Sequence, residues 1–280
     1  TFQNRPTATN NCVEQKINDE MFSISGASTA LVYRYRFFGN VWDARQSIPN
    51  IRNSGESFVL EDLIHVVAGD GAGLHEVYDP IKNKWDAAEP LAVEQGTGGG
   101  EAMGIFGYIF GGFIAAAATA TGQKFTPLTN AWSAIANLNL ASTAMGHGSG
   151  QGLIFRLGGA AGTYHANIEA YDVDANTWAA RIGLNTARSV GASFTFERGI
   201  GYAGGLTAGG VSSTINEIHD NIGNVTQVMK AMTTATYDLQ GMGSALNGMG
   251  HVAGGTGGIA IANRYVPMNN HIVSQFAVFF

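Results

Sequence analysis

The sequence predicts an all-β fold built from six copies of one unit, and three features of the 280-residue chain lead to this prediction. A short motif of an aromatic residue, a polar turn and Trp recurs at nearly constant intervals. A second marker, an apolar run that ends in small residues, precedes each copy. Glycine is frequent, with 39 residues in the chain, and has no collagen-like period of three. We therefore expect the glycines at many tight turns and strand ends.

The motif begins with an aromatic or apolar residue and ends seven residues later. It is clearest in the second and fourth copies, where both read aromatic-Asp, a polar turn that contains Asn, and Trp. The copies are Tyr35–Trp42, Tyr78–Trp85, Phe125–Trp132, Tyr171–Trp178, Ile218–Val225 and Tyr265–Ile272. Successive copies start 43 to 47 residues apart, so six units fill the chain. A regular period in this range is typical of repeat architectures.

The second marker lies upstream of each motif, and four of its six copies carry a Gly-Gly pair. The set is Phe22–Ala27, Val66–Gly69, Tyr108–Gly112, Ile154–Gly159, Tyr202–Gly205 and Val252–Gly255. Together the two markers resemble the kelch repeat over nearly the whole chain, strongly in the second and fourth units and weakly in the fifth and sixth. The resemblance implies one all-β domain over residues 1–280, a six-bladed β-propeller of four-stranded antiparallel blades. The approximate blades are 10–45, 56–88, 100–135, 147–181, 188–228 and 241–280.

The residues of each unit fit strands of such a blade in order. First strands are visible as Ser57–Leu60 and Ser189–Phe194. The Gly pair at the end of the second strand allows positive φ and close approach of a neighbouring backbone. The turn residues between the two aromatic positions predict a hairpin of the third and fourth strands, whose rings pack between blades. Asn247-Gly248 predicts a tight hairpin between the first two strands of the last blade.

Composition excludes several classes of function. The net charge is −6 with 13% charged residues and no Lys/Arg cluster, so we expect no nucleic-acid binding. The single Cys12 excludes an internal disulfide framework and an all-Cys metal site. The segment Thr1–Arg5 lacks the features of a signal peptide. Met103–Gly122 carries no charge over twenty residues, but the repeat predicts two buried strands and a Gly-rich turn there rather than a membrane segment.

Candidate binding residues fall in the loops that join the blades, where propellers of this kind carry function. They are Arg52, Glu94, Glu101, His147, Arg188 and His251. For Arg52 and Arg188 we favour a structural role, because the guanidinium fork suits ties to carbonyl and carboxylate groups between blades. His147 and His251 occupy corresponding places in two blades, and two histidines without nearby carboxylates make a weak metal signal. His219-Asp220 is expected to be a solvated turn pair.

No recognisable catalytic constellation emerges, so we predict a protein that is not an enzyme and needs no metal or cofactor. A copper site like that of galactose oxidase needs a Cys cross-linked to Tyr, and Cys12 assembles no such set. Gly146–Gly150 contains a Gly-His-Gly-Ser-Gly sequence outside a strand-to-helix context, and Gly96–Gly100 precedes no helix or Lys. We expect a binding or structural propeller that presents loops to a protein partner or a large assembly, such as a virion or tail surface. The alternative is a glycan-binding or sugar-modifying propeller similar to the mutarotases, with Arg52, Arg188 and Glu94 or Glu101 at the axis.

Overall fold

The structure is a computed structural model, and it is built almost entirely of short antiparallel strands. It describes residues 5–7, 11–18, 20–26, 29–69, 73–196, 198–232, 235, 239–246, 249–254 and 263–265, the last three ranges by their backbone alone. No helix of these residues is long and apolar enough to cross a membrane. The segment predicted as two buried strands holds β10 (Phe106–Phe110) and a small surface hairpin of β11 (Phe113–Ile114) and β12 (Ala117–Ala118). The next strand, β13 (Gly122–Thr126), begins at the last residue of this segment.

Five sheets have four strands each, and in all five the strands pair in sequence order from the first to the fourth. The first three are β1 (Val13–Ile17) to β4 (Val41–Arg45), with β2 (Glu20–Ile24) and β3 (Val32–Arg36); β5 (Glu56–Leu60) to β8 (Lys84–Ala87), with β6 (Leu63–Val67) and β7 (His75–Asp79); and β9 (Gly99–Met103), β10 (Phe106–Phe110), β13 (Gly122–Thr126) and β14 (Ala131–Ile135). The next two are β15 (Gly146–Gly150), β16 (Leu153–Leu157), β17 (Ile168–Asp172) and β18 (Thr177–Arg181); and β19 (Ala192–Phe196), β20 (Gly199–Ala203), β23 (Asn216–Asp220) and β24 (Val225–Val228).

The remaining elements are smaller. A sixth sheet has three strands, β25 (Leu239–Leu246), β26 (Met249–Gly254) and β27 (Asn263–Tyr265). Two short hairpins project from second-to-third-strand connections, β11 (Phe113–Ile114) with β12 (Ala117–Ala118) and β21 (Leu206–Thr207) with β22 (Val211–Ser212). The 3-10 turns η1 and η2 cover Pro127–Thr129 and Ala208–Gly210.

The blade count differs from the prediction: the structure shows five four-stranded blades of a β-propeller, not six. The sixth repeat forms the three-stranded sheet, and residues 266–280 of its predicted blade lie outside the described residues. This copy of the motif is also the one in which Ile272 stands where the clear copies have Trp. The predicted turn at Asn247-Gly248 likewise lies outside the described residues.

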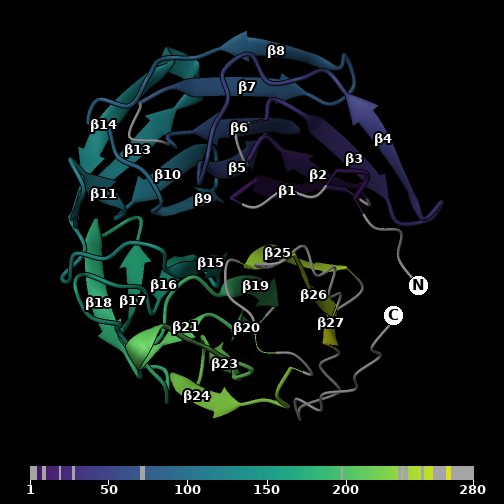
Figure 1. The fold of residues 1–280 in the computed structure, drawn as a ribbon. Coiled ribbons are helices and arrows are strands. Elements are labelled where there is room, and N and C mark those ends of the chain that lie inside the picture. Colours follow the sequence, from purple (N-terminus) through teal and green to yellow (C-terminus); the bar gives the residue numbers. More distant parts are fainter. Residues whose placement is uncertain are drawn as a thin grey trace. The chain divides into compact units, whose positions relative to one another are not determined.

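The chain divides into two compact units. The amino-terminal unit, Arg5–Thr143 with Val173–Trp178, holds the first three blades, whose sheets follow one another with β4, β8 and β14 outermost (Figure 1). In this unit the first strands β1, β5 and β9 pack in succession. The carboxy-terminal unit contains Ala144–Asp172 and Ala179–Phe280, and there β15, β19 and β25 pack in the same way.

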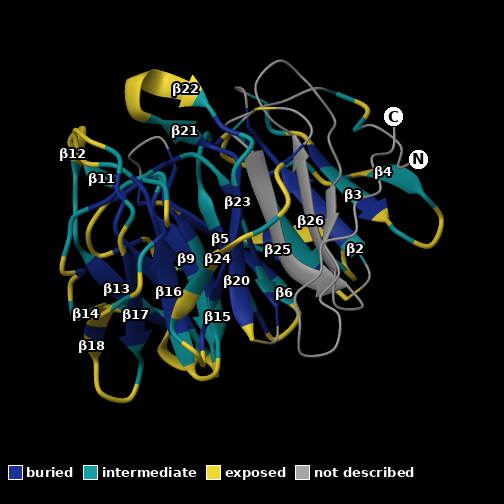
Figure 2. Cartoon of the chain, turned by 90° about the horizontal axis from the view of Figure 1, so that it is seen from below, coloured by how far each residue is buried: buried dark blue, intermediate teal, exposed yellow. Residues whose placement is uncertain are grey.

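Burial follows from the position of each strand in its blade. The second strands are almost fully buried, as in β16 and β20, because each lies between two other strands and between neighbouring sheets. The outer fourth strands consist of half-buried and exposed residues, apart from the buried Trp85 and Trp178 (Figure 2). One core cluster of the amino-terminal unit joins Phe22, Ile64 and Tyr78, and one of the carboxy-terminal unit joins Phe155 and Tyr202. These cores lie between sheets, so each blade depends on its neighbours for apolar burial.

The end of each second strand explains the Gly-Gly marker. The first position of the pair has φ of 58° to 65° and tolerates Ser25 and Ala68, whereas the second has φ of 88° to 96° and is Gly in all five blades. A Cβ at Gly112 or at Gly205 would collide with a backbone carbonyl of the loop packed against it. The second position therefore requires Gly both for its dihedral angle and for the close approach.

The aromatic-Asn-Trp motif forms a clasp between consecutive blades. In the second blade, Asn83 Oδ1 accepts a hydrogen bond from Gln46 N (2.8 Å), and Trp85 Nε1 donates to Gln46 O (2.9 Å). Gln46 directly follows β4, the outer strand of the first blade. Both its backbone N and its backbone O are thus hydrogen-bonded by the hairpin of the second blade. The same pair of bonds is made to Glu89 and Ala136, and the Asn has positive φ in the five copies that the structure describes. Asn suits this position because it tolerates the left-handed region.

The fifth copy of the motif is displaced by one residue from the predicted register. The clasp there binds Ile182 through Asn224 Oδ1 (2.9 Å) and Thr226 Oγ1 (3.3 Å), so the copy runs from His219 to Thr226 and not from Ile218 to Val225. His219 is fully buried on β23, which corrects its assignment to a solvated turn. Thr in place of Trp removed the marker that fixes the register in the other copies.

Candidate functional site

Arg52, a predicted binding residue, lies in a buried polar latch between the first two blades. Its side chain is 1% exposed and its Nη2 forms an ion pair with Glu76 Oε2 at 2.6 Å. Nη1 donates to the carbonyl groups of Ala68 (2.8 Å) and Leu74 (2.9 Å), which flank the second-to-third-strand connection. Asn50 Nδ2 donates to the other Glu76 oxygen at 2.8 Å. The guanidinium group is therefore held inside the protein.

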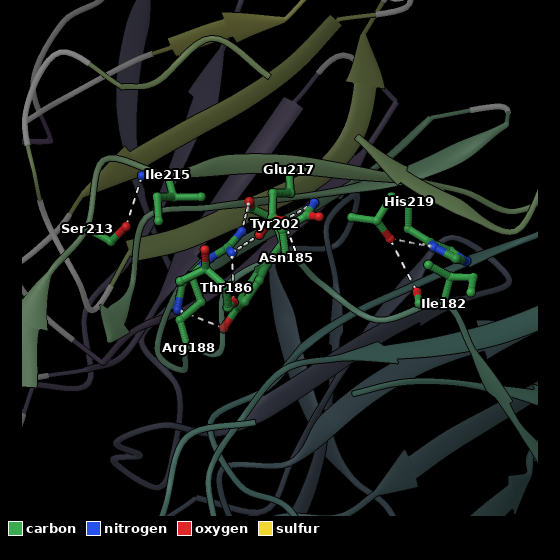
Figure 3. A network of polar contacts seen from close by, with 11 residues as sticks. Ile182, Asn185, Thr186, Arg188, Tyr202, Ser213, Ile215, Glu217 and His219 are labelled. Carbon is green, nitrogen blue, oxygen red and sulfur yellow. Dashed lines mark hydrogen bonds and ion pairs between the residues drawn. The ribbon is translucent and has the colours of Figure 1, made fainter. Parts of the chain in front are cut away.

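Arg188 forms an equivalent latch in the carboxy-terminal unit (Figure 3). It pairs with Glu217, and neither side chain is exposed. Arg188 Nη2 donates to Tyr202 O at 2.7 Å, and its guanidinium carbon lies 4.8 Å from the centre of the Tyr202 ring. Asn185 donates to Glu217 Oε1 through both its backbone N (2.6 Å) and its Nδ2 (2.8 Å). A buried guanidinium that is bonded on several sides fits a structural tie better than a ligand contact.

Two further versions of the latch use different residues. Gln95 and Gln123 replace the ion pair in the third blade, with Gln95 Nε2 donating to Gly111 O (2.9 Å) and Gln123 Nε2 donating to Gln95 Oε1 (2.8 Å). In the fourth blade the guanidinium belongs to Arg156 on β16, which pairs with Glu169 and donates to the carbonyls of Gly158 and Asn167. The repeat position of Arg52 is occupied there by Ser142.

The latch contacts described above involve neither Glu94, Glu101 nor His147. Glu94 is exposed in the loop that leads to the third blade. Glu101 and His147 lie on the first strands β9 and β15 rather than in loops, and both are half-buried. His251 lies on β26, where its backbone pairs with that of Met242 and Arg264. Within the described ranges, no three or more His, Cys, Asp or Glu residues gather in a way that could hold a metal.

Sequence reasoning missed a buried histidine pair between the second and third blades. His65 Nδ1 and His75 Nε2 are 2.8 Å apart, and His75 Nδ1 lies 3.2 Å from Glu89 O, the carbonyl that also accepts from Trp132. Desolvation lowers the pKa of His65 to about 4 and of His75 to about 3. Both rings are therefore neutral near pH 7, and the carbonyl requires that His75 carries its proton on Nδ1. His65 then donates from its own Nδ1 to His75 Nε2.

A second titratable group lies at β1. Burial raises the pKa of Glu14 to about 7, with Arg5 opposing the shift. Burial together with the charge of Glu14 raises the pKa of the neighbouring Cys12 thiol to about 12. Cys12 therefore stays protonated, and its thiol is a poor nucleophile and metal ligand.

The turns between third and fourth strands expose large apolar side chains at one repeated position, three residues after the aromatic residue of the motif. Phe38, Ile81 and Leu128 occupy this position in the amino-terminal unit, at relative exposures of 106%, 91% and 93%. We call these three residues the hairpin tips. Ile222 is the equivalent residue of the carboxy-terminal unit, at 59%. The turn that carries Phe38 is drawn as exposed beside β4 in Figure 2.

The repeated four-stranded blades and the ties between consecutive blades define the chain as a β-propeller protein. One solved structure, described as "Structure of YjhT", is similar to it with a TM-score of 0.83 and 14% sequence identity, covering 98% of this chain and 99% of that chain. No known protein family and no curated protein sequence matches the chain. Matches extend over 722 solved chains, and at this identity the likeness establishes the fold alone.

Proposed function

We propose that the protein is a non-enzymatic propeller that binds a macromolecular partner and serves as a component of a large assembly. The observation that carries this proposal is the set of hairpin tips, which expose three large apolar side chains almost completely to solvent. Large exposed apolar patches mark contact surfaces on proteins, and the hairpin tips would contribute to such a surface. Two of the predicted ligand-binding residues, Arg52 and Arg188, are engaged in latches within the protein.

The proposal includes kelch-type repeats and a sixth blade. The Gly pair, the aromatic residue and the clasp of Asn and Trp support the repeat type, because each has one structural task in successive blades. The three-stranded sheet of β25, β26 and β27 supports the sixth blade, since its strands pair in the same order as in the others.

The test is to fractionate the native source by size and to follow this chain by mass spectrometry. Recovery with a large particle at fixed stoichiometry is the expected result. Recovery as a free monomer of 29.3 kDa would overturn the proposal and favour the sugar-binding alternative. Glycan arrays on the purified chain would then be the next measurement.

A further inference from the structure

Arg181 is a half-buried cation at the end of β18, the outer strand of the fourth blade. Among the described residues it forms no ion pair or side-chain hydrogen bond, and its Nε is buried. Arg45 ends β4 in the same way, but its Nε donates to Tyr78 OH (3.0 Å) and its Nη2 to Pro80 O (2.7 Å). In the described part of the chain, Arg181 therefore lacks the partners that the repeat provides for Arg45.

The partners differ because the fifth blade has other residues at these positions. In the corrected register, His219 and Asn221 stand where the two residues that bind Arg45 stand in the second blade. Both face the fourth blade. The ring centres of His219 and Phe155 are 5.9 Å apart, and a Cβ at Gly150 would lie 2.8 Å from Asn221 Nδ2. The two side chains are thus directed at the blade that carries Arg181.

Buried polar atoms of these side chains have no hydrogen-bond partner among the described residues. His219 is fully buried and Asn221 is 7% exposed. His219 Nδ1 lies 3.1 Å from Thr226 Oγ1 (Figure 3), whereas Nε2 and both amide atoms of Asn221 are unpartnered in the described chain. An imidazole is shorter than a Tyr side chain, so His219 brings no group to the place of the Tyr78 hydroxyl. We call Arg181, His219 and Asn221 the polar seam. Because unpaired buried polar atoms are costly, their concentration at one place indicates a ligand.

The chemistry of the polar seam suits an anion. Arg181 carries a positive charge. The neighbouring carboxylate, Asp220, accepts from two backbone N–H groups of its own turn and lies 3.5 Å from Arg198 Nη2. The seam offers N–H donors from Arg181 Nε and the Asn221 amide, and from His219 Nε2 when the ring carries a proton there. Such donors around a cation are what a small anion requires.

The other ionisable groups near the seam are balanced or point away. Two buried ion pairs lie in the same blades, Arg156 with Glu169 and Arg188 with Glu217. In β15 the residues that face the fifth blade are glycines, so His147 lies on the opposite face of this strand. The local charge is therefore that of Arg181, to which protonation of His219 adds.

We propose that the polar seam binds one small monovalent inorganic anion, of the size of chloride, between Arg181, His219 and Asn221. The anion supplies a counter-charge for Arg181 and takes the place that the Tyr78 hydroxyl has in the first pair of blades. Burial, and to a smaller degree the charge of Arg181, lowers the pKa of His219 to about 4. A bound anion opposes this shift, so binding tightens as the pH falls from 7 to 5.

The experiment compares urea unfolding of the purified chain in sodium chloride and in sodium methanesulfonate, whose anion is larger, each at about 200 mM. With a dissociation constant of about 1 mM for the protonated form, chloride should raise the folding equilibrium constant about 20-fold at pH 5 and less than about 2-fold at pH 7. NMR titration should also give a higher pKa for His219 in chloride than in methanesulfonate.

Three variants locate the effect. Arg181→Gln removes the charge, and His219→Tyr supplies the hydroxyl found in the first pair of blades, so both should lose the chloride effect at pH 5. The matched control, Arg45→Gln, changes the corresponding arginine of the first blade and should keep the effect. Each variant is compared with itself in the two salts, so a change in its overall stability does not alter the comparison. If Arg181→Gln does not fold, His219→Tyr and the NMR titration of the wild-type chain decide.

A wild-type chain that is equally stable in both salts at pH 5 overturns the inference, because the seam then holds water and no anion. A folded Arg181→Gln variant that keeps the full chloride effect overturns the assignment to this seam. A chloride effect of the same size at pH 5 and pH 7 contradicts the role of His219.

Discussion

The latch between Arg52 and Glu76 can be tested against its own counterpart in the next blade, where Gln95 and Gln123 do the same task without charge. Arg52→Gln removes an ion pair of 2.6 Å and leaves the carboxylate of Glu76, which is 5% exposed, without a cation. We expect a loss of about 3–5 kcal/mol in the free energy of unfolding, the usual cost of an unpaired buried charge.

The stability losses of the two single variants should not add up to the loss in the double variant. Glu76→Gln keeps an acceptor for Asn50 and leaves Arg52 bonded to the carbonyls of Ala68 and Leu74, so its expected cost is about 2 kcal/mol. The double variant recreates the amide pair of the third blade, in which Gln95 Nε2 donates to Gly111 O. Its cost should be about 1–2 kcal/mol, which makes the coupling energy at least about 3 kcal/mol.

The assay is urea unfolding followed by tryptophan fluorescence and far-UV circular dichroism, with the slope m compared among the four proteins. An Arg52→Gln variant that loses less than about 1 kcal/mol would show that the pair is not buried as described, since surface pairs contribute that little. A double variant as unstable as the sum of the two single variants would refute the equivalence of the charged and uncharged latches.

Three further predictions concern the clasp, the buried histidines and the glycines. Asn83→Ala should cost about 2–3 kcal/mol in thermal unfolding, and Asn83→Gly about 1 kcal/mol less, because Gly restores the left-handed conformation but not the hydrogen bonds. His219 has a pKa of about 4 through burial, against 6.5 when unfolded. The unfolded chain takes up the proton first, so stability is full above pH 6.5 and falls by about 2 kcal/mol by pH 5 for each such histidine. His219→Tyr should reduce that loss in urea titrations at the two pH values, and an unchanged pH dependence would contradict the assignment. Gly112→Ala should unfold the protein or lower its melting temperature strongly, whereas Gly104→Ala, at a positive φ with open space around it, should cost about 1 kcal/mol; similar losses at both sites would rule out the collision with Gly96.

Much of the fold could be predicted because the motif makes the same contacts in successive copies of the described chain. Trp85, Trp132 and Trp178 each donate one hydrogen bond to the preceding blade, so the spacing of the Trp residues reports the spacing of the blades. The predicted register of the fifth copy was wrong by one residue. There Thr226 makes the hydrogen bond that Trp makes elsewhere, and His219 occupies the aromatic position. Neither substitution leaves a recognisable pattern in the sequence.

The candidate site was less accessible to sequence reasoning. The arginine positions stood out by their place in the repeat, but their carboxylate partners lie 24 and 29 residues away on third strands and carry no local signal. The histidine pair likewise joins residues of different strands. The neutral state of both rings follows from their burial, which the sequence does not show. The hairpin tips were visible in the sequence only as single apolar residues within polar turns. Their exposure became evident when the turns were placed in space.

The clasp gives the repeat a direction along the polypeptide. The receiving peptide groups at Gln46, Glu89 and Ala136 are always synthesised before the Asn and Trp that bind them. During translation each new blade therefore meets a finished docking point on the blade already made, and assembly can proceed from the amino terminus without waiting for the rest of the chain. A chain that stops early leaves one peptide group to be hydrated by water, whereas a chain that lacks its first blade leaves a Trp side chain without a place to bind. Both truncations uncover an apolar blade face, but in the clasp itself the loss of the first blade costs more than the loss of the last.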